Sequence, residues 1–224
     1  MQQPTLQRKL VWPALLRLAH WGMALAVIAL LLTAWLLYWA PSVAKAASDY
    51  HQIAGALLML SLLLRFWLLL TDRTVAGWQA LIPARSSWAA MIKTLQFYIT
   101  FGKMPLPAWY SHNPLWVPVY AIVLLLLALL ALTGFFMPEH PVVMGVYLPT
   151  LHKAVAPLIG VFALAHVVAV VMHDARAKQA DISGMLNGYR IFEIKPLEPS
   201  ASAGEQKISL DQIGVKQWHP DSKD

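Results

Sequence analysis

The sequence predicts an all-α membrane protein, a bundle of four transmembrane helices. Hydrophobic residues make up 58% of the 224 positions and charged residues only 12%, far from the roughly one quarter that is charged in soluble domains. Four apolar runs are long enough to cross a bilayer, which takes ~20 residues. The ~10-residue alternating segments that are typical of a membrane β-barrel are not visible.

The four runs lie within residues 1–195, which we expect to form a single membrane domain. They cover approximately 10–40, 48–70, 115–137 and 150–173. The second run is interrupted only by Arg65, close enough to its end for the side chain to reach the headgroups by snorkelling. The polar stretch 196–224, rich in Pro and Ser, predicts a mostly disordered cytoplasmic tail.

One further helix is predicted between the second and third runs, in "SSWAAMIKTLQFYITFG" at residues 86–102. Its apolar residues, among them Trp88, Ile92 and Leu95, recur at helical spacing. Such a helix either lies in the membrane interface or folds against the bundle.

The orientation follows from the basic residues that flank the four runs. Three flanks are basic: Arg8, Lys9 and Arg17; Arg73, Arg85, Lys93 and Lys103; Arg176, Lys178, Arg190 and Lys195. The loops at 41–49 and 138–149 hold Lys45 alone. Both termini should therefore be cytoplasmic. The net charge of +6 is accounted for by this asymmetry, and no nucleic-acid binding is expected.

Four histidines lie within the predicted helices: His20 in the first, His51 in the second, and His152 and His166 in the fourth. Fourteen residues at 100° each return to within ~40° of the starting direction, so His152 and His166 share one helix face, ~21 Å apart along the axis. Because successive helices alternate in direction, His20 and His166 fall toward the cytoplasm, and His51 and His152 toward the outside. The depths within each pair also match.

Two histidine pairs, each contributed by two helices, suit a flat cofactor held between imidazoles, as in bis-histidine haem ligation. Gly55, one turn after His51, would let a porphyrin face approach the backbone. The absence of cysteine excludes covalent C-x-x-C-H haem and thiolate-ligated iron–sulfur clusters. Zinc or copper would need three or four converging ligands.

The alternative for each of these histidines is an interhelical hydrogen bond without a cofactor. The remaining histidines considered, His140, His173 and His219, are expected to be ordinary surface residues because they lie at a helix end, in a loop or in the tail.

This histidine pattern resembles the bacterial di-haem cytochrome b group, which includes cytochrome b561 and the cytochrome b subunits of formate dehydrogenase and of membrane-bound nickel–iron hydrogenase. The stretches "SHNPLWVPVYAIVLLLLALLALTGFFM" and "ADISGMLNGYRIF" are similar to characteristic stretches of the hydrogenase type. The resemblance implies a multi-pass protein of the bacterial inner membrane that transfers electrons through two b-type haems, from a periplasmic nickel–iron hydrogenase to quinone.

Two other functions remain open from the sequence. The same haem pair could serve another oxidoreductase, linked to formate, thiosulfate or cytochrome c, or could oxidise quinol as a cytochrome b561. A helical scaffold or transporter without haem belongs to a different class. The chain would be part of an enzyme only as the electron-transferring, quinone-reducing subunit of an oxidoreductase complex. Its expected contacts are this partner, quinone and the membrane lipids.

Several polar residues are candidates for contacts with these groups. Arg17 and Arg65 could bind the propionates of the inner haem and Lys153 those of the outer haem, with simple snorkelling as the alternative. In "SHNP", His112 could pass protons near neutral pH and Asn113 could hold a quinone carbonyl. The resemblance also implies quinone contact in this region. Otherwise, Asn113 only caps the third helix and His112 is solvated.

Overall fold

Four long helices form the centre of the structure, a computed structural model that describes residues 5–176 and 181–194. They are α1 (Ala14–Trp39), α2 (Ala44–Thr71), α4 (Val117–Phe136) and α5 (Leu148–Arg176). Among the described residues, these four helices are long and apolar enough to cross a membrane. The predicted bundle is thus confirmed, with helix ends that differ from the expected ones by a few residues. The expected tail at 196–224 lies outside the described residues.

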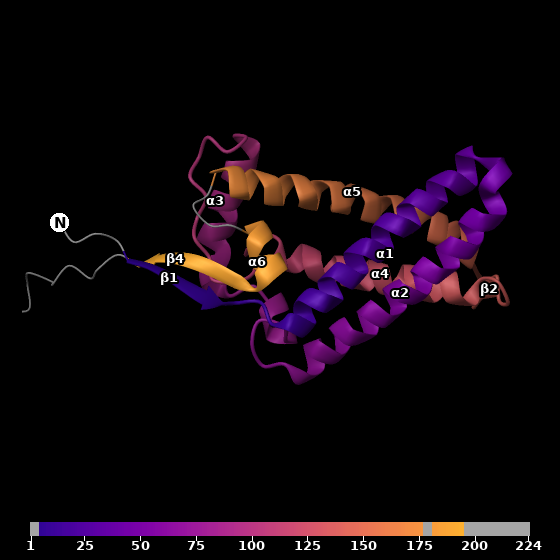
Figure 1. The fold of residues 1–224 in the computed structure, drawn as a ribbon, viewed down its shortest axis with the longest axis horizontal. Helices are drawn as coiled ribbons and strands as arrows, with labels where there is room; N and C mark the ends of the chain where they lie inside the picture. Colours follow the sequence, from indigo (N-terminus) through magenta and orange to yellow (C-terminus); the bar gives the residue numbers. More distant parts are fainter. Residues whose placement is uncertain (1–4, 177–180, 195–224) are drawn as a thin grey trace, which may run out of the picture. The chain divides into compact units, whose positions relative to one another are not determined.

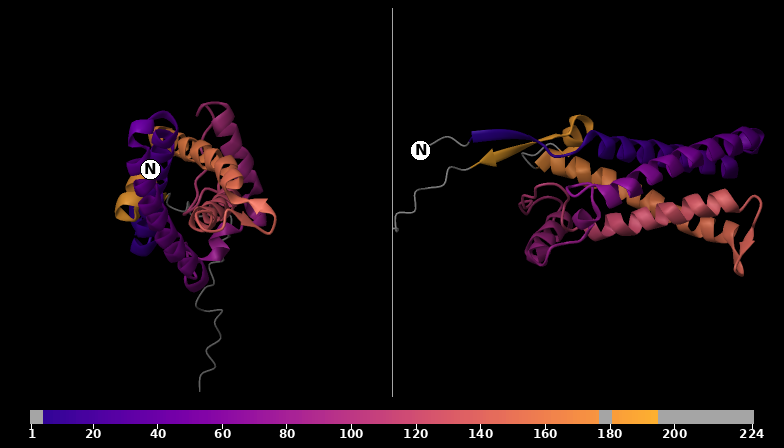
Figure 2. Two further views of the ribbon diagram at one scale, coloured as in Figure 1. Left: turned by 90° about the vertical axis from the view of Figure 1, so that its right-hand side faces the viewer. Right: turned by 90° about the horizontal axis from the view of Figure 1, so that it is seen from below.

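Within the unit Leu6–Phe192, short connections join α1 to α2 and α4 to α5, whereas the longer segment 72–116 lies between α2 and α4. The 3₁₀ turn η1 (Pro41–Val43) connects α1 to α2, and a hairpin of β2 (Val142–Val143) and β3 (Val146–Tyr147) connects α4 to α5. Figures 1 and 2 show both connections at the same end of the helices. Close packing joins α1 to α2, α2 to α4 and α4 to α5.

The hairpin between α4 and α5 has a two-residue loop. Val142 pairs with Tyr147 and Val143 with Val146 in antiparallel register. Both loop residues have positive φ, 48° at Met144 and 80° at Gly145. Positive φ at both central positions defines the type I′ turn, which matches the twist of paired strands.

An apolar core fills the middle of the bundle. It includes Ala26 of α1, Leu58 and Leu62 of α2, Leu127 of α4 and Ile159 of α5, each at most 6% exposed. The outward faces of the helices remain apolar and exposed, as suits contact with lipid hydrocarbon.

Smaller elements lie at the other end of the bundle, where α1 begins and α5 ends (Figure 1). They are η2 (Trp78–Leu81), η3 (Arg85–Ser87), α3 (Trp88–Ile99) and α6 (Asp181–Asn187). The chain also forms a two-stranded sheet of β1 (Thr5–Leu10) and β4 (Tyr189–Ile194).

Helix α3 is the one predicted between the second and third runs. Its Thr94 and Phe97 are buried, and Phe97 contacts His173 of α5, so the helix folds against the bundle. Trp88 and Ile92 are exposed, which leaves an apolar face suited to the membrane interface.

Candidate functional site

The structure brings the four helix histidines together as two pairs. The ring centroids of His20 on α1 and His166 on α5 are 6.2 Å apart, with the ring planes inclined by 60°. Those of His51 on α2 and His152 on α5 are 6.4 Å apart, with an inclination of 66°. In both cases, the two partners that the sequence assigned to each other therefore lie opposite one another.

This spacing fits one metal ion between two imidazoles. A metal–imidazole bond is about 2 Å long and the ring nitrogen lies about 1 Å from the centroid, so two axial ligands have centroids about 6 Å apart. In the described part of the chain, no three His, Cys, Asp or Glu side chains gather as a metal site. A square-planar group that needs only two axial protein ligands, such as haem, suits these pairs.

The helices that carry the paired histidines are not packed closely against each other. Neither α1 with α5 nor α2 with α5 is among the closely packed helix pairs of the described residues. Near the second pair, a Cβ added to Gly55 would meet no atom within 4 Å. The expectation that a porphyrin face approaches Gly55 is compatible with this open space.

Sequence reasoning missed two residues that touch the second pair. The hydroxyl Oγ1 of Thr33 lies 2.8 Å from Nδ1 of His51, and that of Thr133 lies 2.9 Å from Nδ1 of His152. The sequence contained a signal for these two threonines. The tetrads "LTAW" at 32–35 and "LTGF" at 132–135 are similar, and in each case the next long helix along the chain carries the histidine.

The three residues expected to bind propionates differ in their surroundings. Lys153 is exposed beside His152. Arg17 donates from Nη1 to the carbonyl oxygen of Leu186. Arg65 does not snorkel as expected: it is 5% exposed and its Nη1 donates to the carbonyl oxygen of Ala76 at 2.6 Å. The segment after α2 folds back over the helix end and supplies this acceptor within the protein.

His112 lies between the first pair and the start of α1. Its ring centroid is 4.9 Å from that of Trp12 and 6.1 Å from that of Tyr120, whose ring in turn lies 6.3 Å from that of His166. Nδ1 of His112 is buried and has no hydrogen-bond partner among the described residues. His112 is thus half-buried, with this ring nitrogen shielded from solvent.

Burial also changes the protonation of His112. The loss of hydration, together with the positive charge of Arg65, lowers the pKa of His112 to about 4. The ring is therefore neutral at physiological pH, instead of titrating near neutrality as expected from the residue type. A neutral imidazole still offers one donor and one acceptor nitrogen.

Asn113 is 5% exposed and uses its two side-chain atoms differently. Oδ1 accepts a hydrogen bond from the backbone N–H of Leu115 at 3.0 Å, within the turn that precedes α4, so it does not cap the helix itself. Nδ2 is buried without a partner among the described residues. This amide can donate to an acceptor that enters the site.

The motif "NGYR" at 187–190 positions the segment that precedes His112. Arg190 is 2% exposed, and its Nη1 donates to the carbonyl oxygens of Trp109, Tyr110 and Ser111 at 3.3, 2.9 and 3.3 Å. Gly188 has a φ of 88°, and a Cβ there would lie 2.8 Å from the carbonyl oxygen of Trp12. Only glycine fits this position without displacing the start of α1.

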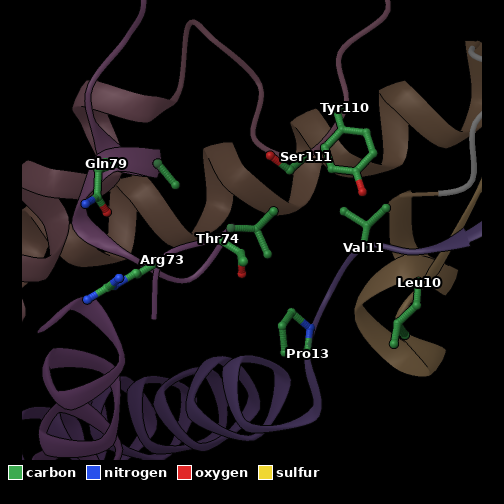
Figure 3. A pocket seen from close by; sticks show the side chains of 10 residues that line it. Leu10, Val11, Pro13, Arg73, Thr74, Gln79, Tyr110 and Ser111 are labelled. Atoms are coloured by element: carbon green, nitrogen blue, oxygen red, sulfur yellow. The ribbon is translucent and has the colours of Figure 1, made fainter. Parts of the chain in front are cut away.

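A pocket of about 600 Å³ lies next to this segment. It is lined by Leu10, Val11, Pro13, Arg73, Thr74, Val75, Gln79, Ala80, Tyr110 and Ser111. Figure 3 shows Tyr110 and Ser111 on one wall, across from Thr74 and Val11. The pocket borders on the His112 region along the chain, since Ser111 precedes His112 and Val11 precedes Trp12.

His173 was expected at the surface, but it is 4% exposed. Its Nε2 lies 2.7 Å from the hydroxyl of Tyr98, which accepts a hydrogen bond from Nε1 of Trp116 at 2.7 Å. Helix α3 covers the end of α5 and buries this histidine. His140 is exposed as expected, and His219 lies outside the described residues.

Comparisons with known proteins agree with a haem-binding bundle. The model of a family described as prokaryotic cytochrome b561 matches residues 11–188. The probable Ni/Fe-hydrogenase B-type cytochrome subunit of Cupriavidus necator is 25% identical over 213 residues, which cover 82% of this chain and 87% of that protein. No solved structure matches.

Proposed function

This chain belongs to the prokaryotic cytochrome b561 family, and we propose that it carries electrons across the bacterial inner membrane from a periplasmic nickel–iron hydrogenase to quinone. In this proposal, one b-type haem is bound by His20 and His166 and a second by His51 and His152. The family and the name of the relative support an electron-transferring cytochrome b that is a hydrogenase subunit.

The main support for this proposal is the position of two histidine pairs at two depths of the bundle. Both pairs have ring centroids 6.2–6.4 Å apart, and His152 and His166 lie on one helix. Their separation of fourteen residues corresponds to ~21 Å of helix axis. Each haem, when bound, accepts and donates one electron at a time. The protein holds the imidazoles at two depths and excludes water with the apolar core between them.

The sides follow from the distribution of charge. The end of the bundle with His20 and His166 carries the basic flanks, and the end with His51 and His152 carries the two short, weakly charged connections. By the positive-inside rule, the first pair faces the cytoplasm and the second the periplasm. A hydrogenase would then deliver electrons near the hairpin of β2 and β3.

We place the quinone site at His112 and Asn113. A quinone that gains two electrons also gains two protons, so its carbonyl oxygens need hydrogen-bonding groups near the inner histidine pair. Nδ2 of Asn113 is a buried donor without a partner in the described part of the chain, and Tyr120 links His112 to His166 by ring contacts. The adjoining pocket offers a space beside this pair of residues.

The haem part of the proposal is tested by single substitutions of the histidines. His51→Ala and His20→Ala proteins are purified and their haem content and low-spin spectra measured against the unsubstituted protein. We expect two haems per chain without substitution and one in each variant, with different haems retained. Two normal haems in the His51→Ala protein would contradict the pairing.

The quinone part is tested with the protein in its complex with the hydrogenase. Asn113→Ala should abolish quinone reduction while hydrogen still reduces both haems. Gln96→Ala, at an exposed position of α3 away from the pocket, is the matched control. Unchanged quinone turnover in the Asn113→Ala complex would move the site elsewhere.

A further inference from the structure

We propose that Thr33 and Thr133 are matched positioning residues that fix the tautomer and the orientation of the His51 and His152 rings. Through these rings they lower the reduction potential of the outer haem. This inference rests on the proposed function, because it needs a haem at that pair. It goes beyond that function by assigning two residues that distinguish the outer site from the inner one.

The hydrogen bonds of Thr33 determine which nitrogen of His51 carries the proton. Oγ1 of Thr33 lies 2.7 Å from the carbonyl oxygen of Ala29 and 2.8 Å from Nδ1 of His51. The hydroxyl has a single proton, and a carbonyl oxygen can only accept. The proton therefore goes to Ala29, Oγ1 accepts from Nδ1–H of His51, and Nε2 of that histidine keeps its lone pair for a metal.

Thr133 repeats this arrangement on the other side of the site. Its Oγ1 lies 2.8 Å from the carbonyl oxygen of Leu129 and 2.9 Å from Nδ1 of His152. Thr33 and Thr133 are 7% and 4% exposed, so water does not compete for these bonds. Both ligands of the outer pair are thus held by a buried threonine four residues after its backbone acceptor.

The inner pair differs in this respect. Nδ1 of His20 is buried and has no hydrogen-bond partner among the described residues. The outer site therefore has a donated Nδ1–H bond on each ligand, whereas His20 of the inner site finds no such acceptor within the described part of the chain.

This difference in hydrogen bonding affects the reduction potentials of the two haems in a definite direction. An imidazole that donates its Nδ1–H to an oxygen becomes a stronger electron donor to the metal, which favours the oxidised iron and lowers the potential. The two threonines therefore shift the outer haem downward relative to the inner one. With haems bound at both pairs, this shift would favour electron transfer from the periplasmic side toward the quinone.

The test compares Thr33→Val and Thr133→Val, which keep the shape and remove the hydroxyl, with Thr33→Ser and Thr133→Ser, which keep the hydroxyl. Midpoint potentials of both haems are measured by optical redox titration of the purified protein, and the ferric haems are followed by EPR. We expect each Val substitution to raise the outer potential, the double Val protein to raise it further, and the inner potential to stay constant. The Ser proteins should resemble the unsubstituted one.

Each result of this test either supports or overturns the role of the two hydroxyl groups. Unchanged potentials in a double Val protein with two haems would overturn the inference and leave the proposed function intact. If the Val proteins lose the outer haem, with about 10- to 100-fold weaker retention, recovery in the Ser proteins supports the role of the hydroxyl. Loss in the Ser proteins as well would overturn it. Failure of the proposed function would show in the unsubstituted protein, as fewer than two haems.

Discussion

Gly134 of α4 lies directly against the imidazole of His152 on α5. A Cβ added to Gly134 would be 3.3 Å from Cε1 and 3.8 Å from Nδ1 of that ring. The preceding residue, Thr133, accepts from the same Nδ1. Two consecutive residues of α4 therefore contact the ring of His152, and the glycine sets how closely the ring approaches the helix.

Gly134→Ala should disturb the outer haem, because the added methyl group forces the ring of His152 to move by a few tenths of an ångström. We expect a shifted low-spin EPR signal and faster loss of the outer haem, with the inner haem unchanged. Gly160→Ala is the matched control, since its Cβ would meet Leu31 Cδ2 at an ordinary 3.6 Å. Identical spectra for both variants would show that the ring has room to adjust.

The stability of the protein should fall on acidification through His112. Its pKa in the folded protein is about 4, below the ordinary 6.5, so the unfolded chain binds the proton more readily. The stabilisation is complete above pH 6.5 and is lost as the pH falls toward 4. The full difference corresponds to ~3 kcal/mol.

The measurement is the thermal unfolding midpoint in detergent at pH 7 and pH 5. His112→Gln should lose less stability between these two conditions than the unsubstituted protein does. An equal loss in both proteins would assign the acid sensitivity to other groups.

The pairing of the histidines could be predicted from the sequence because it depends on a few strong regularities. The length of the apolar runs predicts where the helices lie, and successive helices alternate in direction. The charged residues at the helix ends then indicate the depths of His20 and His166. None of these steps needs a side-chain contact.

The threonines and the buried histidine could not be predicted in the same way. Thr is tolerated at most positions of a membrane helix, and the role of Thr33 depends on where the ring of His51 lies. Tyr98 and His173 are 75 residues apart in sequence, and their hydrogen bond exists because α3 folds back over α5. Arg65 illustrates the same difficulty, since a basic residue near a helix end can reach either headgroups or a returning loop.

Arg190→Gln should loosen the segment before His112. The guanidinium donates to three carbonyl oxygens at 109–111 and is almost fully buried. Loss of these charged donors should cost about 2–3 kcal/mol. We expect a lower unfolding temperature and a raised KM for quinone, with haem content retained. Arg85→Gln, at an exposed position, should change neither quantity. A KM equal to that of the unsubstituted protein would show that Arg190 does not position the quinone site.

Lys153→Gln should affect only the outer haem. Lys153 is exposed beside His152, whereas Arg17 and Arg65 already donate to backbone carbonyl oxygens. If Lys153 binds a propionate, its loss should raise the electron density at the outer haem and lower that haem's midpoint potential. Lys45→Gln is a control near the same end of the bundle, because Lys45 pairs with Asp49 in solvent. Unchanged potentials in both variants would favour a topology role for Lys153.

The orientation of the bundle decides which haem meets the hydrogenase, and the absence of cysteine makes it directly measurable. Met144 is 98% exposed at the tip of the hairpin between α4 and α5, and Arg85 is exposed in η3 beyond the opposite helix ends. Because the basic flanks favour the cytoplasmic side, a membrane-impermeant maleimide should label Met144→Cys in intact spheroplasts. Arg85→Cys should react only after the membrane is permeabilised. The reverse pattern would place His20 and His166 on the periplasmic side, so electrons from a periplasmic partner would enter at the pair next to His112, and the proposed quinone site would lose its access to cytoplasmic protons.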